Sequence, residues 1–493
     1  MHSPEQNPHH FREPTVTLGY EVTGTKAPVE IERRVLGGGH MHVRGRTRSG
    51  KTSLAILPLV QQLIQPYPTR ASSWQHDPIF VFDLGGDLTL FNHVQDLAKQ
   101  LGRQFRFLSL DPLDDWHFFD PLQAIGHGER NVVRLANMLI EAFNLDHGLI
   151  YGGQYFTQQN LAALLRVARQ LNKESDRTPT LEDVAAYLDN PANRREMKDA
   201  EQIRLAFNFL LEYPQLKPEL APDAARRIDM RVAIEGNEVV YFFTPTLNEA
   251  TTARQIAGLG LYSLVNAAIQ MGREGKRPRK IWVFVDEFQE LAGRSFAALL
   301  AQSGKHGISL VMANQTTSQL ESRDTSLAQV VADNTHVKQY FTVTTMEDIE
   351  ALQTLSNQVE RPLGGSSTRG LASTITVRDV LMPKLDHNEV LQVSATFGQS
   401  FLVVDDGRGH KEPQRVFREH TLDPQTWEKY RSTPLPQRAA PLNKPEPVAR
   451  RRKPPVAAGR PATVQMQTTP TRQEHLAKLV SAKRAVEGLE SGP

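Results

Sequence analysis

Two hydrophobic patterns alternate along the chain. Short runs of consecutive apolar residues occur at Ile79–Phe82, Val239–Phe243 and Ile281–Val285, and such runs are typical of parallel strands buried on both faces. Between them lie longer segments with apolar residues at helical spacing, as in residues 51–65. Strands that alternate with helices predict an α/β fold with a mostly parallel, doubly wound sheet. Further strands are predicted at residues 41–45, Phe105–Leu108, Ile308–Met312, Val337–Val343 and Phe401–Val404, with an extended segment at Val16–Ile31.

The strand pattern stops between residues 127 and 228. Apolar residues there recur at helical spacing, and Thr180-Leu181-Glu182-Asp183 resembles a capping box at a helix start. This block is therefore predicted to be all-helical. Residues 1–14 are polar and rich in His and Pro, and residues 421–493 are rich in Pro with a basic cluster at Arg450–Lys453. Both ends are predicted to be disordered.

Composition excludes several classes of protein. The 493 residues carry a formal net charge of only +2 and no cysteine. The small net charge does not suggest a purely electrostatic nucleic-acid binder, and the missing cysteines exclude a disulfide scaffold, a thiolate zinc site and a cysteine nucleophile. No signal peptide and no apolar stretch long enough to span a bilayer are visible. We expect a soluble, cytoplasmic protein that contacts a membrane only through partners.

A phosphate-binding loop is predicted between the strand at residues 41–45 and the helix after it. The segment Gly45-Arg46-Thr47-Arg48-Ser49-Gly50-Lys51-Thr52, followed by Ser53, matches the P-loop pattern G-x-x-x-x-G-K-T. Glycines let successive N–H groups face the phosphates, and the helix presents its positive N-terminal end. Lys51 is expected to reach the β- and γ-phosphates, and Thr52 to bind Mg²⁺ through its hydroxyl. The strand before the loop and the helix after it disfavour a chance match.

Two further strand ends carry candidate catalytic side chains. The apolar strand Ile281–Val285 ends in Asp286 and Glu287. We expect Asp286 to hold Mg²⁺, through water, and Glu287 to polarise the attacking water as general base. A solvated turn after the strand is the alternative. Gln315 follows the strand Ile308–Met312 and could sense the γ-phosphate, although an ordinary polar loop explains it equally well. The Asn-Lys-x-Asp pattern of GTPases is missing, which favours ATP.

A set of motifs in this order resembles the type IV coupling proteins, the TraG/TraD-like conjugation ATPases of the HerA/FtsK superfamily. The resemblance covers about residues 30–410. Besides the P-loop, it rests on Phe82–Leu88, on Phe118–Leu122, on Asp286–Phe288 with Gly304–Leu310, on Asn314–Leu320 and on Asn334–Lys338.

The resemblance implies a RecA-like P-loop NTPase with an inserted all-α domain. The nucleotide-binding domain would then comprise residues 15–126 and 229–420, with the insert at residues 127–228. It also implies a homo-oligomer in the form of a hexameric ring, with ATP and Mg²⁺ between subunits and a basic finger from the neighbour. The matching position is Lys305, where the family often has arginine, and Arg294 and Arg323 are nearby substitutes.

Departures from the family are expected to matter. Gly85 replaces a usual lysine, and Arg48 occupies a variable P-loop position where the family usually has glycine. The N-terminal transmembrane helices of typical members are missing, so a soluble variant is expected, peripheral at the inner membrane only through partners.

The resemblance further implies an ATPase, stimulated by DNA, that delivers DNA or nucleoprotein to a type IV secretion system. Relaxase and secretion-channel proteins would be its partners. DNA-gripping candidates are Lys276, Arg277, Arg279 and Lys280, and a loop from Arg361 to Arg369; solvated basic loops are the alternative. Two other functions stay open: a HerA/FtsK-like translocase for chromosome or plasmid maintenance, and a nucleotide-switched adaptor that recruits substrates.

Overall fold

The computed structural model describes residues 13–438, except 70–72, 144, 146–152, 195–199, 277–279, 323–324, 344, 370–371, 406–408 and 410. Most of the two predicted disordered ends, residues 1–12 and 439–493, therefore lie outside the described residues.

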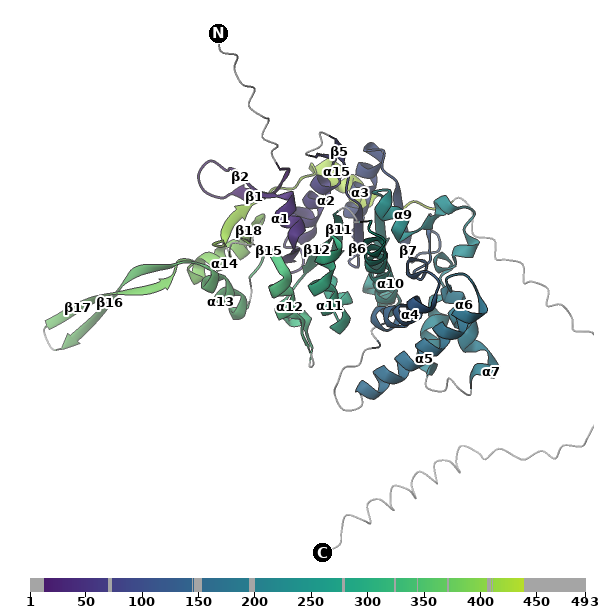
Figure 1. The fold of residues 1–493 in the computed structure, drawn as a ribbon. Helices are drawn as coiled ribbons and strands as arrows, with labels where there is room; N and C mark the ends of the chain where they lie inside the picture. The colour runs from purple at the N-terminus through teal and green to yellow at the C-terminus, as the bar shows by residue number, and fades with distance from the viewer. Residues whose placement is uncertain are drawn as a thin grey trace, which may run out of the picture. The chain divides into compact units, whose positions relative to one another are not determined.

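An 11-stranded sheet forms the centre of the described chain (Figure 1). The strand order is β2-β1-β19-β18-β15-β3-β12-β11-β6-β10-β7. Neighbours from β15 to β7 are parallel, whereas β18, β19, β1 and β2 pair antiparallel. The strands are β1 Thr15–Glu21, β2 Pro28–Glu32, β3 His40–Arg44, β6 Ile79–Asp83, β7 Phe105–Ser109, β10 Val239–Phe243, β11 Ile281–Asp286, β12 Ile308–Asn314, β15 Thr335–Tyr340, β18 Gln399–Val404 and β19 Gln414–Phe417.

The mostly parallel α/β sheet predicted from the sequence is confirmed. Every residue of β3, β6, β10, β11 and β12 is buried. Helices on the faces of the sheet exclude water from these strands, which explains why their sequences are continuous apolar runs. The helices outside the helical insert are α1 Arg33–Gly38, α2 Leu57–Leu63, α3 Leu88–Gln100, α9 Met230–Glu235, α10 Thr246–Arg273, α11 Arg294–Ser303, α12 Leu327–Asn334, α13 Met346–Leu355, α14 His387–Ala395 and α15 Pro424–Ser432.

Glycines on α10 allow it to pack closely on both sides. A Cβ added at Gly260 would lie 2.9 Å from ring carbons of Phe242 and Phe82 in the sheet. A Cβ at Gly258 would lie 3.0 Å from the carbonyl oxygen of Ala142, at the end of α4. Helix α10 is therefore held between the sheet and the helical region without room for side chains at these two positions.

The predicted helical block contains α4 Glu129–Ala142, α5 Gly153–Glu174, α6 Leu181–Asp189, α7 Pro191–Arg194 and α8 Glu201–Leu210. Helix α6 begins with the predicted capping box between Thr180 and Asp183. At the base of the block, β8 Phe118–Phe119 pairs in parallel with β9 Arg227–Ile228. These helices are gathered on one side of the sheet in Figure 1. The exact domain limits stay a prediction.

The prediction that the chain is disordered from residue 421 is wrong for residues 421–438. Helix α15 lies there and packs against α3. Asn92 donates hydrogen bonds to the carbonyl oxygens of Tyr430 and Thr433, at 3.0 and 2.9 Å, and the Tyr430 hydroxyl donates to Asp96 at 2.8 Å. The prediction failed because the composition is Pro-rich and polar, while these stabilising contacts come from residues more than 300 positions earlier.

The segment Arg361–Arg369 is not the loop expected from the sequence. It belongs to β16 Gln358–Arg369, which pairs along its whole length with β17 Ala372–Pro383. The hairpin extends away from the sheet in Figure 1. The glycines and serines of β16 have low strand propensity, so its sequence did not predict a strand, whereas β17 contains β-branched residues that favour strand pairing.

Among the described helices, none is long and apolar enough to cross a membrane.

Candidate nucleotide-binding site

The loop after β3 has the backbone that a phosphate cradle requires. Gly50 has φ +102°, and a Cβ added at Gly45 would lie 2.3 Å from Ser49 Oγ. Arg48 also has a positive φ, of 64°. A π-helical turn starts at Lys51 and runs to Ile56, where α2 continues it. The free N–H groups at this helix start and the curled loop together form a place for an anion.

Lys51 and Thr52 connect the loop to the end of β11. The Lys51 side chain is buried, and its Nζ lies 3.4 Å from the Arg46 carbonyl oxygen and 3.9 Å from Glu287 Oε1. Thr52 Oγ1 donates a hydrogen bond to Asp286 Oδ2 at 2.7 Å. The two motifs are 234 residues apart in sequence, yet they meet at the same sheet edge.

The two acids after β11 face different surroundings. Asp286 is only 4% exposed, and its Oδ1 accepts the Glu287 N–H at 3.0 Å. Glu287 adopts a left-handed backbone, with φ +54°, which turns the chain sharply out of the strand. Its Oε2 accepts a hydrogen bond from Gln289 Nε2 at 2.6 Å. Asp286 is thus held at Thr52 of the loop, while the Glu287 carboxylate lies near Lys51 and Gln315.

Gln315 joins the P-loop to Glu287. Its Nε2 lies 3.3 and 3.2 Å from the two carboxylate oxygens of Glu287. Its Oε1 accepts a hydrogen bond from Thr47 Oγ1 at 3.0 Å. The structure therefore brings Gln315 into the cluster, whereas the sequence left an ordinary loop equally open.

Burial changes the proton affinity of the central carboxyls. Burial, together with the neighbouring charge of Asp83, raises the pKa of Asp286 to about 7. Burial likewise raises the pKa of Asp83 to about 6, with a smaller contribution from Asp87. Asp83 and Asp286 are paired residues on the adjacent strands β6 and β11. Two buried carboxyls at one strand edge favour a bound cation, which would offset their mutual repulsion.

Asp83 was not among the site residues predicted from the sequence. Its oxygens accept hydrogen bonds from the N–H groups of Gly85, Gly86 and Asp87 at 3.1, 2.7 and 2.9 Å. They also accept the Tyr241 hydroxyl at 2.8 Å. The signal in the sequence was its place at the end of a buried strand, in the motif Phe82–Leu88.

The Thr52 and Asp286 oxygens suit a small divalent cation. Hydroxyl and carboxylate oxygens are hard ligands of the kind Mg²⁺ prefers, and Mg²⁺ keeps several of its waters. Thr52 Oγ1 and Asp286 Oδ2 are 2.7 Å apart, and the carboxyl of Asp83 lies on the neighbouring strand. Both observations fit such an ion. Binding of Mg²⁺ by Thr52 and Asp286 stays a prediction.

Of the three candidates for a basic finger, only Lys305 has a side chain among the described residues. Lys305 is exposed in the short turn Gly304–His306 before β12, at the opposite end of this strand from Gln315. Arg294 begins α11, but its side chain lies outside the described residues, as does Arg323.

The predicted DNA-gripping run is not one continuous free patch. Lys276 forms an ion pair with Glu235 at 3.0 Å. Lys280 is partly buried, and burial lowers its pKa to about 8. Arg277 and Arg279 lie outside the described residues. The structure therefore supports a local ion pair at Lys276 and not a free charge.

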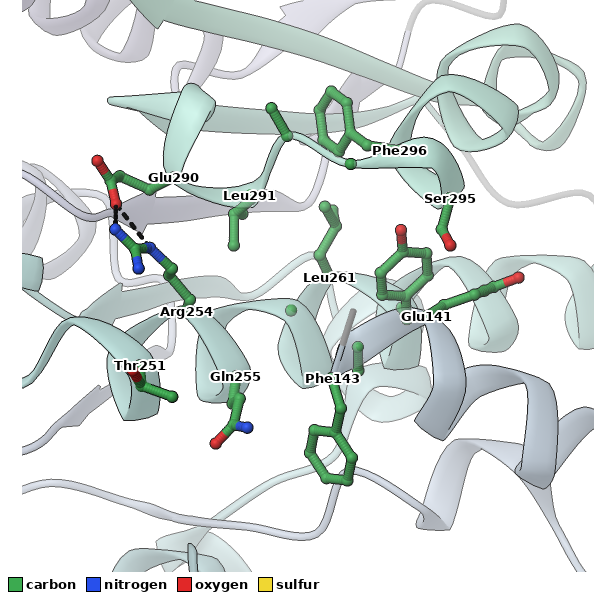
Figure 2. A pocket seen from close by; sticks show the side chains of 15 residues that line it. Glu141, Phe143, Thr251, Arg254, Gln255, Leu261, Glu290, Leu291, Ser295 and Phe296 are labelled. Carbon is green, nitrogen blue, oxygen red and sulfur yellow. Dashed lines mark hydrogen bonds and ion pairs between the residues drawn. The ribbon is translucent and has the colours of Figure 1, made fainter. Parts of the chain in front are cut away.

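A separate cavity of about 190 Å³ lies between α4, α10 and the segment after β11. Figure 2 shows Leu261, Leu291 and Phe296 around it, with the ion pair of Arg254 and Glu290 at one side. None of the P-loop residues lines it. It is therefore distinct from the nucleotide site.

Known proteins resemble this chain over part of its sequence and in its fold. Residues 192–367 match the family model described as the type IV secretion-system coupling protein DNA-binding domain. The predicted resemblance to type IV coupling proteins is confirmed. The matched segment begins in the helical block and includes β11, β12 and most of β16, so it contains Asp286, Glu287 and Gln315.

Solved coupling-protein structures share the fold. The bacterial conjugative coupling protein TrwBdeltaN70, in an unbound monoclinic form, has a TM-score of 0.55 and 16% identity, covering 82% of this chain and 89% of that chain. The plasmid coupling protein TrwB in complex with ADP and Mg²⁺ has a TM-score of 0.54 and 15% identity, covering 82% and 89%.

VirB4 of Thermoanaerobacter pseudethanolicus shares the fold as well. Its TM-score is 0.52 at 14% identity, covering 83% of this chain and 97% of that chain. These structures confirm the RecA-like P-loop fold with a helical domain that was predicted from the coupling-protein resemblance. No curated protein sequence matches the chain.

Asp286→Asn is expected to stabilise the nucleotide-free protein at about pH 8 but not at about pH 4. The folded pKa of Asp286 is raised from 3.8 to about 7. A carboxyl with a raised pKa in the folded state contributes stability that is fully present below its unfolded pKa. This contribution is lost as the pH rises through its folded pKa. Asparagine stays neutral and avoids this loss. Thermal midpoints of both proteins across this pH range test it; a gap that does not change with pH would contradict it.

Proposed function

We propose that the chain is an ATP-hydrolysing motor of the coupling-protein type that moves DNA toward a type IV secretion system. One observation carries the ATPase part of the proposal. Lys51, Thr52, Asp286, Glu287 and Gln315 converge from three strand ends on one phosphate-binding loop. TrwB has been solved in complex with ADP and Mg²⁺ and in complex with a non-hydrolysable ATP analogue, which supports the same ligands here.

The proposed mechanism assigns a step to each side chain. The loop N–H groups and Lys51 would bind the phosphates, and Thr52 and Asp286 would hold Mg²⁺. When bound, Mg²⁺ neutralises charge on the phosphate oxygens. Glu287 accepts a proton from the attacking water, and the Gln315 amide, now 3.2 Å from Glu287, orients that water. The hydrogen bond between Thr47 and Gln315 would open to admit the nucleotide.

The position of Lys305 argues against a role at the nucleotide site of its own subunit. Lys305 precedes β12, whereas Gln315 follows it. A strand rises about 3.3 Å per residue, so Lys305 lies roughly 20 Å from its own site. It therefore cannot contact the nucleotide bound by its own subunit, and a role as a basic finger toward a neighbouring copy is part of the proposal. The hexameric state stays part of the proposal.

DNA is expected to raise the rate of ATP hydrolysis severalfold at low salt. Phosphate contacts release counterions, so the stimulation should weaken between about 50 and 200 mM salt. Steady-state turnover with and without single- and double-stranded DNA measures this, with Lys51→Ala as the inactive control. Wild-type protein that hydrolyses ATP but neither binds nor responds to DNA at low salt would overturn the translocase part.

A further inference from the structure

A buried ion pair lies directly beside the P-loop, and no motif in the sequence pointed to it. Arg44 is the last residue of β3 and immediately precedes Gly45. Its Nη1 and Nη2 donate to Asp348 Oδ1 and Oδ2, each at 2.7 Å. Arg44 is 9% and Asp348 7% exposed. This two-point geometry fixes both side chains more firmly than a single hydrogen bond would.

The same carboxylate reaches the Gln315 turn. Thr317 Oγ1 donates to Asp348 Oδ1 at 3.3 Å and also accepts a hydrogen bond from Arg44 Nη2. Thr317 lies two residues after Gln315 and starts a short helical turn that runs to Leu320. Asp348 thus joins the strand that carries the P-loop to the turn that carries Gln315.

Hydrogen bonds within the turn transmit this restraint to Gln315. The N–H groups of Gln315 and Thr316 both donate to Gln319 Oε1 at 3.2 Å. Asn314 Nδ2 donates to the Thr316 carbonyl oxygen at 2.8 Å. The turn is therefore a small rigid unit whose position depends on its outside contacts, and the contact through Thr317 is one of them.

Stability alone does not explain this arrangement. Apolar residues of similar volume often stabilise a core as well as a buried ion pair does. Arg44 Nε, within the described part of the chain, is buried without a hydrogen-bond partner. The guanidinium is thus placed to suit Asp348 and Thr317 at a cost in its own hydrogen bonding.

We propose that Asp348 is a positioning residue for hydrolysis. Through Arg44 and Thr317 it holds the turn 314–320 so that the Gln315 amide meets the Glu287 carboxylate. Its role in catalysis rests on the proposed ATPase function, whereas its hold on the turn does not.

Asp348→Asn tests the hold on the turn directly. Asparagine keeps the shape but loses the charged two-point contact. Hydrogen–deuterium exchange of the segment 314–320 should become faster in the variant, in nucleotide-free protein. The matched control is Glu238→Gln, which disrupts a second two-point pair that is partly buried: Arg106 of β7 donates to Glu238, just before β10, at 2.5 and 2.9 Å. Unchanged exchange in Asp348→Asn, or an equal rise in Glu238→Gln, would overturn the proposal.

Kinetics separate positioning from a general structural role. In Asp348→Asn we expect kcat to fall roughly 10- to 100-fold, since small misplacements near reacting groups have effects of this size. The Kd of a fluorescent ATP analogue should change less than about threefold, because Lys51 and the loop remain.

A double substitution completes the test. If Asp348 acts through Gln315, adding Asp348→Asn to Gln315→Ala should lower kcat no further. Full additivity would contradict the assignment. If the wild type hydrolyses no ATP, the proposed function fails, while the exchange measurement still decides whether Asp348 holds the turn.

Discussion

Glu287→Gln is expected to bind ATP normally and to hydrolyse it about 1,000-fold more slowly. Glutamine has the same shape and can keep the contacts with Gln289 and Gln315. It cannot accept a proton from water near neutral pH. Lys51 and Thr52, which are expected to bind the phosphates and Mg²⁺, are left intact.

Single-turnover hydrolysis and equilibrium binding of an ATP analogue measure the two effects separately. Glu290→Gln is a suitable control, because Glu290 lies three residues away and pairs with Arg254 at the side of the cavity in Figure 2. Its hydrolysis rate should stay close to that of the wild type. Wild-type turnover in Glu287→Gln would remove Glu287 from its assigned role and point to Asp286 or a neighbouring copy as the base.

Asp83→Ala is expected to lower the free energy of unfolding by roughly 3 kcal/mol or more. The Asp83 carboxyl is fully buried and accepts three backbone N–H groups and the Tyr241 hydroxyl. Tyr241 is itself fully buried, so water cannot replace the lost partner without entering the core. Each buried group left unsatisfied costs about 1–3 kcal/mol.

Urea unfolding of Asp83→Ala and Asp96→Ala tests this prediction. Asp96 also accepts a tyrosine hydroxyl at 2.8 Å, from Tyr430, but on the partly exposed surface between α3 and α15. Its loss should cost only about 1 kcal/mol. If both variants lose the same free energy of unfolding, the buried network around Asp83 stabilises the fold no more than the partly exposed contact of Asp96.

Much of the sheet could be predicted from the sequence because its strands are buried on both faces. The observed β10 has the bounds predicted for it, and β11 and β6 differ only by the acid that ends each strand. The P-loop was equally predictable, since its pattern is local and its glycines are required by backbone geometry at Gly45 and Gly50.

Contacts between distant residues could not be predicted in this way. Arg44 and Asp348 are 304 positions apart, and neither belongs to a motif that announces its partner. Asp83 lies within the motif Phe82–Leu88, but its hydrogen bonds depend on how the following turn folds back. Helix α15 was missed for the same reason, because its composition resembles that of a linker while its partners lie on α3.

The pairing of β8 with β9 brings the two ends of the helical block close together. Strand β8 Phe118–Phe119 precedes the helices of the block and β9 Arg227–Ile228 follows them, and the two strands lie side by side. Neighbouring strands are about 4.8 Å apart, so the two ends of the block are almost joined already. We therefore expect that the intervening helices can change in length without moving the strands that carry Asp286 and Gln315, as long as α4 keeps its contact with α10. A chain with a different helical block would then keep the same phosphate-binding loop and the same strand ends around it.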